Sequence, residues 1–194
     1  MKQKKKAGHG EIVRKVFDGL ADLLIATKMT YHGNIYFALG KIIKALLEEK
    51  EIKKKQIKKT LYDLEQKKFL YLKKRKDEVY VYIREKGRKK ILQYSIKKIL
   101  DFKKKTKKWS GKWFLVFFDV PENQRNKRDH LRNFLRFIGF YPYQKSVYIF
   151  PYDCQEEIAL VKKIIEGGKY LSYIVAEKIE DEKKFKNKFG LYKA

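Results

Sequence analysis

The chain has 194 residues, 44% of them hydrophobic and 37% charged, and it carries a formal net charge of +26 at pH 7. This length and apolar content predict one large or two small folded domains and exclude a disordered polycation. The single cysteine, Cys154, excludes an intramolecular disulfide framework and fits a reducing compartment such as the cytoplasm.

The positive charge is unevenly distributed along the chain. Residues 1–108 contain 33 Lys and Arg against 12 Asp and Glu, whereas residues 109–194 contain 16 against 11. Such an excess attracts polyanions, so we expect the N-terminal half to bind nucleic acid and the protein to be cytoplasmic and nucleoid-associated. Heat tolerance or genome base composition also enriches lysine, but these explain the uneven split less well. We expect no membrane partner, because residues 12–27 are too short and too often charged to cross a bilayer.

Three helices are predicted in the N-terminal half, after a lysine-rich arm. Apolar residues recur there every three or four positions. The three segments are residues 11–28, 35–50 and 54–68. In the third, Ile57, Leu61 and Leu64 form the buried stripe, which leaves a cationic outer face that can donate hydrogen bonds.

A hairpin with a basic tip is predicted next. Apolar residues alternate with polar ones over residues 70–72 and again over 79–83, and the tip between them, residues 73–78, begins with four consecutive cations. A further helix starts near Glu85. Helices followed by such a hairpin are typical of a winged helix-turn-helix, which we place at residues 1–108 together with the arm and a helical linker.

The remaining residues predict a ferredoxin-like domain at 109–180. A strand at 113–118 is apolar on both faces, as a covered central strand requires, and it ends at Asp119. The elements that follow it are a helix from Pro121 to Gly139, strands at 140–144 and 146–150, a helix at 155–166 and a strand at 170–178. The order βαββαβ is that of the split βαβ plan, so the fold class is α+β, with residues 181–194 as a charged tail.

Several motifs in this second region resemble a known family. They are Trp109-Ser-Gly-Lys-Trp113, Phe118-Asp-Val-Pro-Glu122, Arg125, Arg128, Leu131, Gly139-Phe140, Gln144-Lys-Ser-Val147 and Pro151. Together they resemble the PaaX-like transcriptional regulators, which couple a winged helix to a domain similar to the second CRISPR-associated protein, the nuclease-like adaptor of spacer integration. The resemblance implies a homodimer formed through the ferredoxin-like domain. It does not extend to the additional C-terminal domain of the larger regulators, for which this chain is too short.

Ten residues are candidates for contacts with double-stranded DNA. They are Lys54, Lys55, Lys58, Lys59, Tyr62 and Gln66 on the third helix, and Lys73, Lys74, Arg75 and Lys76 on the hairpin. The helix would enter the major groove while the hairpin contacts flanking phosphates. The alternative is a merely solvated helix face. Lysine mostly positions a protein on DNA rather than reading bases, so we expect modest sequence discrimination.

Asp119 is the candidate for metal chemistry. In the CRISPR-associated relatives the matching aspartate is thought to hold a divalent metal across the dimer, so the resemblance allows a Mg²⁺ site that activates water against a phosphodiester. The alternative, which we favour, is that Asp119 or Glu122 caps the next helix. No firm catalytic residue and no cofactor are expected, with Mg²⁺ only if the nuclease interpretation holds.

Three further groups of residues have possible functional roles, each with a structural alternative. Arg125, Arg128, Arg132 and Arg136 could contact phosphates or pair with Asp129. His9, His32, His130 and Cys154 match no metal or nucleophile motif. Phe117, Tyr148 and Phe150 fit a core or a dimer interface better than a surface that stacks RNA bases.

Two functions follow from these observations. The first is a non-enzymatic, sequence-preferring transcriptional repressor that binds duplex DNA as a dimer. The second is a CRISPR-associated type of Mg²⁺-dependent endonuclease or spacer-integration adaptor that uses Asp119 as a metal ligand.

Overall fold

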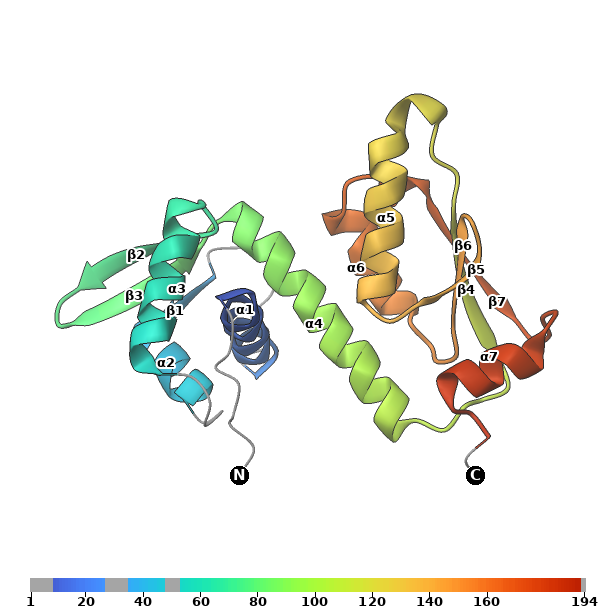
Figure 1. Ribbon diagram of the computed structural model, residues 1–194, viewed down its shortest axis with the longest axis horizontal. Helices are drawn as coiled ribbons and strands as arrows, with labels where there is room; N and C mark the ends of the chain where they lie inside the picture. The colour runs from blue at the N-terminus through green and yellow to red at the C-terminus, as the bar shows by residue number, and fades with distance from the viewer. Residues whose placement is uncertain (1–8, 27–34, 48–52, 193–194) are drawn as a thin grey trace. The chain divides into compact units, whose positions relative to one another are not determined.

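The computed structural model describes residues 9–26, 35–47 and 53–192, and these form two compact units, Met1–Ser95 and Ile96–Ala194 (Figure 1). The units divide inside helix α4 (Glu85–Thr106), upstream of the boundary predicted at Lys108. The prediction differs because the lysines of residues 101–112 suggested a linker, whereas Ile96 and Leu100, earlier on the same helix, are buried in the core of the second unit. Among the described helices, none has the length and apolar content needed to cross a membrane.

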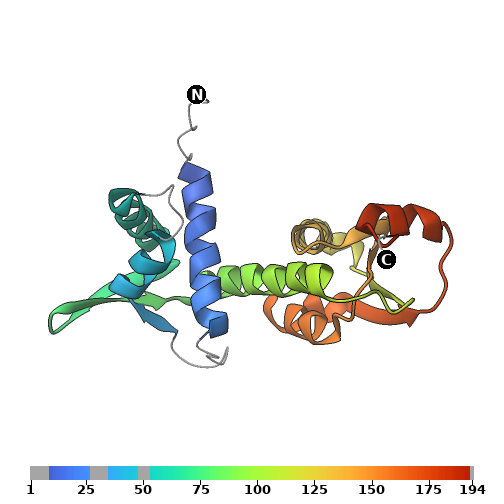
Figure 2. The same cartoon turned by 90° about the horizontal axis from the view of Figure 1, so that it is seen from below.

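The first unit combines helices with a three-stranded antiparallel sheet. Its elements are α1 (His9–Ala26), β1 (Tyr36–Ala38), α2 (Leu39–Leu47), α3 (Lys54–Gln66), β2 (Leu70–Arg75), β3 (Glu78–Ile83) and the first part of α4. The strand order is β1-β3-β2. Both views show the β2–β3 hairpin projecting beyond the helices of its unit (Figures 1 and 2). Helices followed by a hairpin with a basic tip appear in the order that was predicted from the sequence.

Strand β1 corrects the helix predicted for residues 35–50. Tyr36–Ala38 pairs with Tyr80–Tyr82 of β3, and the Ile83 amide donates to the Ile35 carbonyl at 2.8 Å, so helix α2 starts only at Leu39. Ile35-Tyr36-Phe37 is a run of β-branched and aromatic residues, which fits a pleated surface better than a helix. Apolar spacing alone does not separate the two in so short a segment.

The core of the first unit lies between its helices and one face of the sheet. Its fully buried members include Val16, Leu20, Ile35, Ile42, Leu46, Ile57, Leu61, Leu70, Val81 and Ile91. Gly19 permits the close approach of α1 and α2, because a Cβ atom there would lie 2.7 Å from the Leu46 side chain. The glycine that weakens α1 as an isolated helix is thus explained by packing.

The second unit has the predicted βαββαβ order. Its elements are β4 (Trp113–Phe118), a 3₁₀ turn (Glu122–Gln124), α5 (Arg125–Phe137), β5 (Tyr141–Gln144), β6 (Val147–Phe150), α6 (Gln155–Ile164), a 3₁₀ turn (Gly168–Tyr170), β7 (Leu171–Ala176) and α7 (Glu182–Phe189). The sheet is antiparallel with strand order β5-β6-β4-β7. The predicted helix start at Pro121 is a short 3₁₀ turn, and α5 begins at Arg125.

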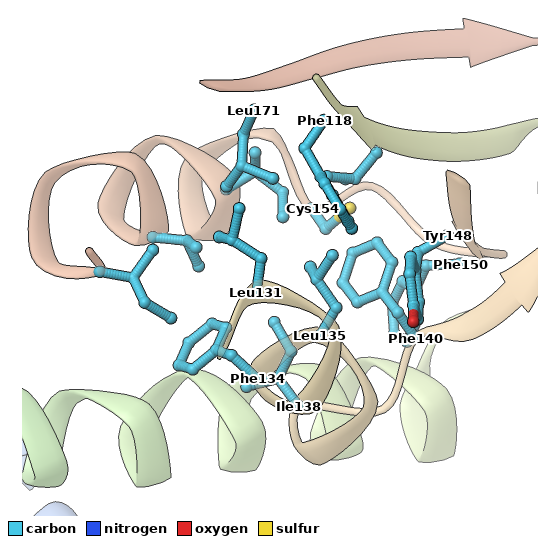
Figure 3. Packing of buried hydrophobic residues seen from close by; sticks show 14 of the residues in the cluster. Phe118, Leu131, Phe134, Leu135, Ile138, Phe140, Tyr148, Phe150, Cys154 and Leu171 are labelled. Carbon is cyan, nitrogen blue, oxygen red and sulfur yellow. The ribbon is translucent and has the colours of Figure 1, made fainter. Parts of the chain in front are cut away.

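One face of this sheet packs on α5 and α6. Leu131 and Leu135 of α5 meet Phe118, Tyr148 and Phe150 of the strands in a single cluster of buried residues (Figure 3). Tyr148 and Phe150 are 1% and 0% exposed, which confirms that they belong to the core. The central strand is covered on both faces as predicted, because its alternate residues lie in two separate clusters.

Helix α7 covers part of the other sheet face and corrects the charged tail predicted for residues 181–194. Phe185 is only 2% exposed, with its ring centroid 5.2 Å from that of Tyr143 and 6.3 Å from that of Trp113. The Trp113 indole N–H donates to Glu182 Oε1 at 3.0 Å. A few apolar residues spaced along a lysine-rich segment therefore suffice to dock it on an aromatic surface.

We predict that Phe185→Ala lowers the free energy of unfolding of the second unit by about 3 kcal/mol, because truncating a buried phenylalanine removes apolar contact and leaves a cavity. Urea unfolding followed by tryptophan fluorescence measures this directly, since both tryptophans, Trp109 and Trp113, belong to the same cluster. Tyr192→Ala, at a position 57% exposed, serves as the control. A loss below about 1 kcal/mol for Phe185→Ala would contradict the docking of α7.

Candidate nucleic-acid interface

Helix α3 buries one face and exposes the other. Ile57, Thr60, Leu61 and Leu64 are buried, and α3 contacts α1, α2 and β2. The six residues predicted for its outer face, Lys54, Lys55, Lys58, Lys59, Tyr62 and Gln66, are all exposed. The structure therefore brings the predicted helix candidates together on one accessible face.

The first turn of α3 carries lysines where acidic residues would be favourable. The N-terminus of a helix is the positive end of its dipole, so Lys54 and Lys55 there destabilise the helix slightly. The Gln56 side chain offsets part of this cost, because its Oε1 accepts the Lys53 amide at 2.9 Å. A bound phosphate would interact favourably with the lysines and with the helix end at once.

Hydrogen bonds attach α3 to the hairpin that follows it. Glu65 Oε1 accepts the Leu72 amide of β2 at 2.7 Å, and the Phe69 amide donates to the Leu64 carbonyl at 2.9 Å. The carboxylate occupies the free side of an edge strand, where a backbone amide would otherwise lack a partner in the protein. These bonds hold the outer face of α3 in a defined position relative to the hairpin.

The hairpin tip exposes its cations, as predicted from the sequence. Lys73, Lys74, Arg75 and Lys76 are all exposed. Strand pairing extends to Arg75 and Glu78, which leaves Lys76 and Asp77 as the turn. Lys76 has a φ of +51°, a conformation that costs a residue other than glycine roughly 1–2 kcal/mol. A cation is therefore kept at the tip where glycine or asparagine would form the turn more easily.

A row of tyrosines on the sheet is a second feature of the hairpin, and it was not predicted from the sequence. Tyr36, Tyr71 and Tyr82 lie opposite one another on three adjacent strands, on the sheet face directed away from the helices. Tyr71, Tyr80 and Tyr82 alternate with apolar residues in the sequence, but their partner Tyr36 was assigned to a helix. The strand pairing of β1 was needed to complete the row.

Asp119 lies exposed directly after β4. The prediction that Asp119 or Glu122 caps the next helix is wrong. Neither the 3₁₀ turn that follows nor α5 has a side-chain cap, and Glu122 instead binds Arg128 at 2.9 Å. The Asp119 amide donates to the Tyr170 carbonyl at 3.3 Å, which fixes its backbone. Within the described ranges, no cluster of three or more His, Cys, Asp or Glu residues could hold a metal ion.

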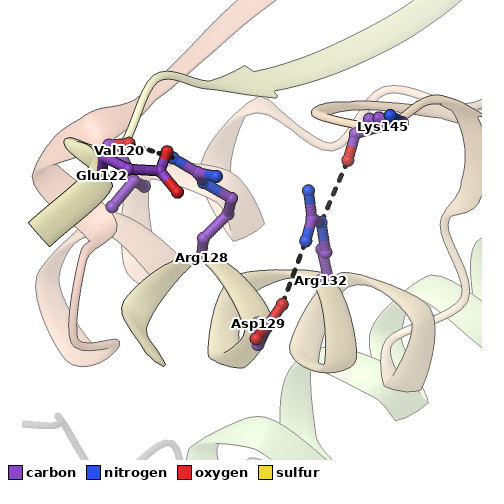
Figure 4. Close-up of polar contacts among 6 residues, drawn as sticks. All are labelled: Val120, Glu122, Arg128, Asp129, Arg132 and Lys145. Atoms are coloured by element: carbon purple, nitrogen blue, oxygen red, sulfur yellow. Dashed lines mark hydrogen bonds and ion pairs between the residues drawn. The ribbon is translucent and has the colours of Figure 1, made fainter. Parts of the chain in front are cut away.

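Two of the four arginines of α5 have structural partners (Figure 4). Arg128 donates to the Val120 carbonyl at 2.8 Å and to Glu122, while Arg132 donates to the Lys145 carbonyl at 3.1 Å and to Asp129 at 3.0 Å. Pairing with Asp129, the second of the two predicted alternatives, is therefore confirmed for Arg132, whereas Arg128 pairs with Glu122 instead. Arg125 and Arg136 are exposed.

Cys154 and the histidines form no reactive site in the described part of the chain. Cys154 is fully buried in the core of the second unit, and this burial raises the pKa of its thiol far above the usual value (Figure 3). His130 is exposed on α5. His32 and the side chain of His9 lie outside the described residues.

We predict that Cys154 does not react with a thiol-specific disulfide reagent at pH 8 in the folded protein, because a protonated, buried thiol is a poor nucleophile. Release of the chromophore should reach one equivalent only after guanidinium is added. Rapid stoichiometric reaction of the native protein would contradict the burial of Cys154.

Comparison with known protein families gives a match over residues 106–187 to the family described as PaaX protein central Cas2-like domain. The matched segment begins at the end of α4 and ends within α7, so α7 forms part of the matched domain. No curated protein matches the chain.

Proposed function

Because residues 106–187 match the PaaX protein central Cas2-like domain, we propose that the chain is a transcriptional repressor that binds double-stranded DNA. The observation that carries this proposal is the outer face of α3, where six polar and cationic side chains are exposed above a buried apolar stripe. The charge of the N-terminal half supports the assignment of DNA binding to the first unit.

In this proposal α3 enters the major groove of the duplex. The groove is about 12 Å wide and admits one helix. Lys54 and Lys58 would contact phosphates, while Tyr62 and Gln66, further along the same face, would reach base edges. Gln66 has the amide donor and acceptor that pair with adenine. With lysine as the main contact, charge supplies most of the affinity and the discrimination between sequences is modest.

The hairpin would add contacts beside the groove. The hairpin projects beyond the helices of the unit (Figures 1 and 2), and its four consecutive exposed cations would contact the flanking phosphates. The bonds from Glu65 to Leu72 and from Phe69 to Leu64 keep the hairpin and α3 in register, so both would meet the duplex without a separate ordering cost. This mode of binding requires no cofactor.

A homodimer formed through the second unit completes the proposal. β7 is an edge strand of its sheet, and Ile174 and Val175 on it are 50% and 47% exposed. Exposed apolar residues on an unpaired edge strand favour contact with another chain. Two copies related by a two-fold axis would place two first units on the half-sites of a roughly palindromic operator.

We predict that Lys54→Ala/Lys58→Ala weakens duplex binding by a similar factor for all sequences and reduces the dependence of log affinity on log salt by about one for each lysine. Fluorescence anisotropy over a series of salt concentrations measures both effects. The matched control is Lys162→Ala/Lys163→Ala, which removes two exposed lysines from α6 of the second unit. If the control pair lost as much affinity and slope, binding would follow from net charge and not from α3.

We also predict that Val175→Glu lowers the mass measured by analytical ultracentrifugation from twice the chain mass of 23.4 kDa to that of one chain, because a buried unpaired carboxylate opposes association. Duplex affinity should fall with it. A wild-type protein that sediments as a monomer at concentrations that saturate DNA would contradict the dimer.

A further inference from the structure

The outer face of the first sheet carries a continuous row of tyrosines. Tyr82 of β3 lies between Tyr36 of β1 and Tyr71 of β2, with ring centroids 5.1 and 4.9 Å away and interplanar angles of 25° and 11°. Tyr80 meets Tyr36 edge-on at 6.0 Å. We call these four residues the tyrosine row. Residues alternate between the two faces of a sheet, so the row lies opposite the face that packs on the helices.

Arginines lie against the rings of the tyrosine row. The Arg84 guanidinium carbon is 5.3 Å from the centroid of Tyr71, and that of Arg75 is 5.4 Å from the centroid of Tyr82. Both arginines are exposed. A planar guanidinium on an aromatic ring is favourable and offers a further planar surface on which another ring can stack.

An open hollow with a volume of about 670 Å³ adjoins Tyr71. Its lining residues are Lys68, Tyr71, Ile83, Arg84, Glu85, Lys86, Arg88 and Lys89. Among these described residues Glu85 is the sole acid, and its carboxylate is 3.0 Å from the Lys89 ammonium. Five cations against one paired acid make the hollow suited to an anion, and Tyr71 and Arg84 make one wall of it planar.

Stabilisation of the sheet does not account for the whole arrangement. Cross-strand aromatic pairs contribute roughly 0.2–1 kcal/mol each, but Tyr36 and Tyr71 remain 41% and 36% exposed on the two edge strands. Tyr82 is 7% exposed, and its hydroxyl has no hydrogen-bond partner within the described residues. The two edge rings of the row are therefore open to a ligand.

We propose that this face binds single-stranded DNA, with unpaired bases stacked on the exposed rings and phosphates on the cations at both ends of the tyrosine row. Aromatic rings beside a cationic track are the general means of binding unpaired strands. One end of the row has the hollow, and the other has Lys73 and Arg75 on the same sheet face. Cations at both ends require a ligand with several phosphates, which a strand has and a mononucleotide lacks.

The charges on this face leave room for a strand between them. Glu78 is the acid that faces the row, and it accepts the Tyr80 hydroxyl at 3.0 Å at the hairpin end. Tyr71 and Arg84 lie toward the opposite end of the paired strands. The tyrosine row is distinct from the outer face of α3, whereas Lys73 and Arg75 of the hairpin belong to both proposed contacts.

The test compares two ligands on the full chain by fluorescence anisotropy, a labelled 12-nucleotide strand that cannot pair with itself and a duplex of equal length. We expect Tyr36→Leu/Tyr71→Leu to lower the strand affinity by about 5- to 100-fold and to change the duplex affinity by less than about twofold. Tyr36→Phe/Tyr71→Phe, which keeps the rings, should retain strand binding. Tyr62→Leu is the matched control at the exposed tyrosine of α3, and it should weaken the duplex but not the strand.

Two outcomes with the tyrosine double variants would overturn the proposal. One is unchanged strand affinity in a leucine double variant whose urea midpoint equals that of the wild type, and the other is an equal loss in the phenylalanine variant. Should the leucine variant be destabilised, Arg84→Gln answers the same question without altering the sheet, and unchanged strand affinity there also overturns it. Competition by free thymidine monophosphate as effective as the strand, per nucleotide, would assign a mononucleotide site instead. Strand binding without duplex binding would contradict the proposed function and leave this inference standing.

Discussion

The candidate interface depends on the burial of Ile57, Leu61 and Leu64, which fixes α3 against the first unit. The exposed lysines of this helix oppose its formation, because Lys54 with Lys58 and Lys55 with Lys59 place like charges one turn apart. Each such pair destabilises a helix by roughly 0.2–0.5 kcal/mol, whereas burying one leucine or isoleucine stabilises the fold by about 1.5–3 kcal/mol. Apolar contact therefore outweighs the repulsion and keeps the cations exposed for a polyanion.

The same balance explains the rest of the first unit. The Glu65 carboxylate accepts a hydrogen bond from the Leu72 amide, so the hairpin is attached to α3 by a polar contact as well as by the core. With α3 and the hairpin fixed, the cations do not have to be ordered when DNA binds. On the other side of the sheet, the rings of the tyrosine row pack on one another and leave both edges of the row open to a ligand.

Much of this organisation was predictable because the apolar patterns are strong. Three patterns each specify an element and the face that it buries. They are the apolar stripe of α3, the alternation of apolar residues in the hairpin, and the strand Trp113–Phe118, which is apolar on both faces. The errors fall where local pattern and tertiary contact disagree. Tyr36–Ala38 is a strand only because β3 pairs with it, and Phe185 is buried only because Trp113 and Tyr143 provide a surface for it. Capping by Glu122, the other candidate beside Asp119, does not occur because its carboxylate pairs with Arg128, six residues further along the chain.

The central claim is that the outer face of α3 makes this protein a regulator with a defined site on duplex DNA. Its most direct test is a fluorescence-anisotropy titration at near-physiological salt that compares a duplex from the gene's own upstream region with a scrambled duplex of equal length and composition. The account predicts at least a tenfold preference for the upstream duplex, which corresponds to about 1.4 kcal/mol. Equal affinity for the two duplexes would contradict it and leave a protein that binds DNA through charge alone.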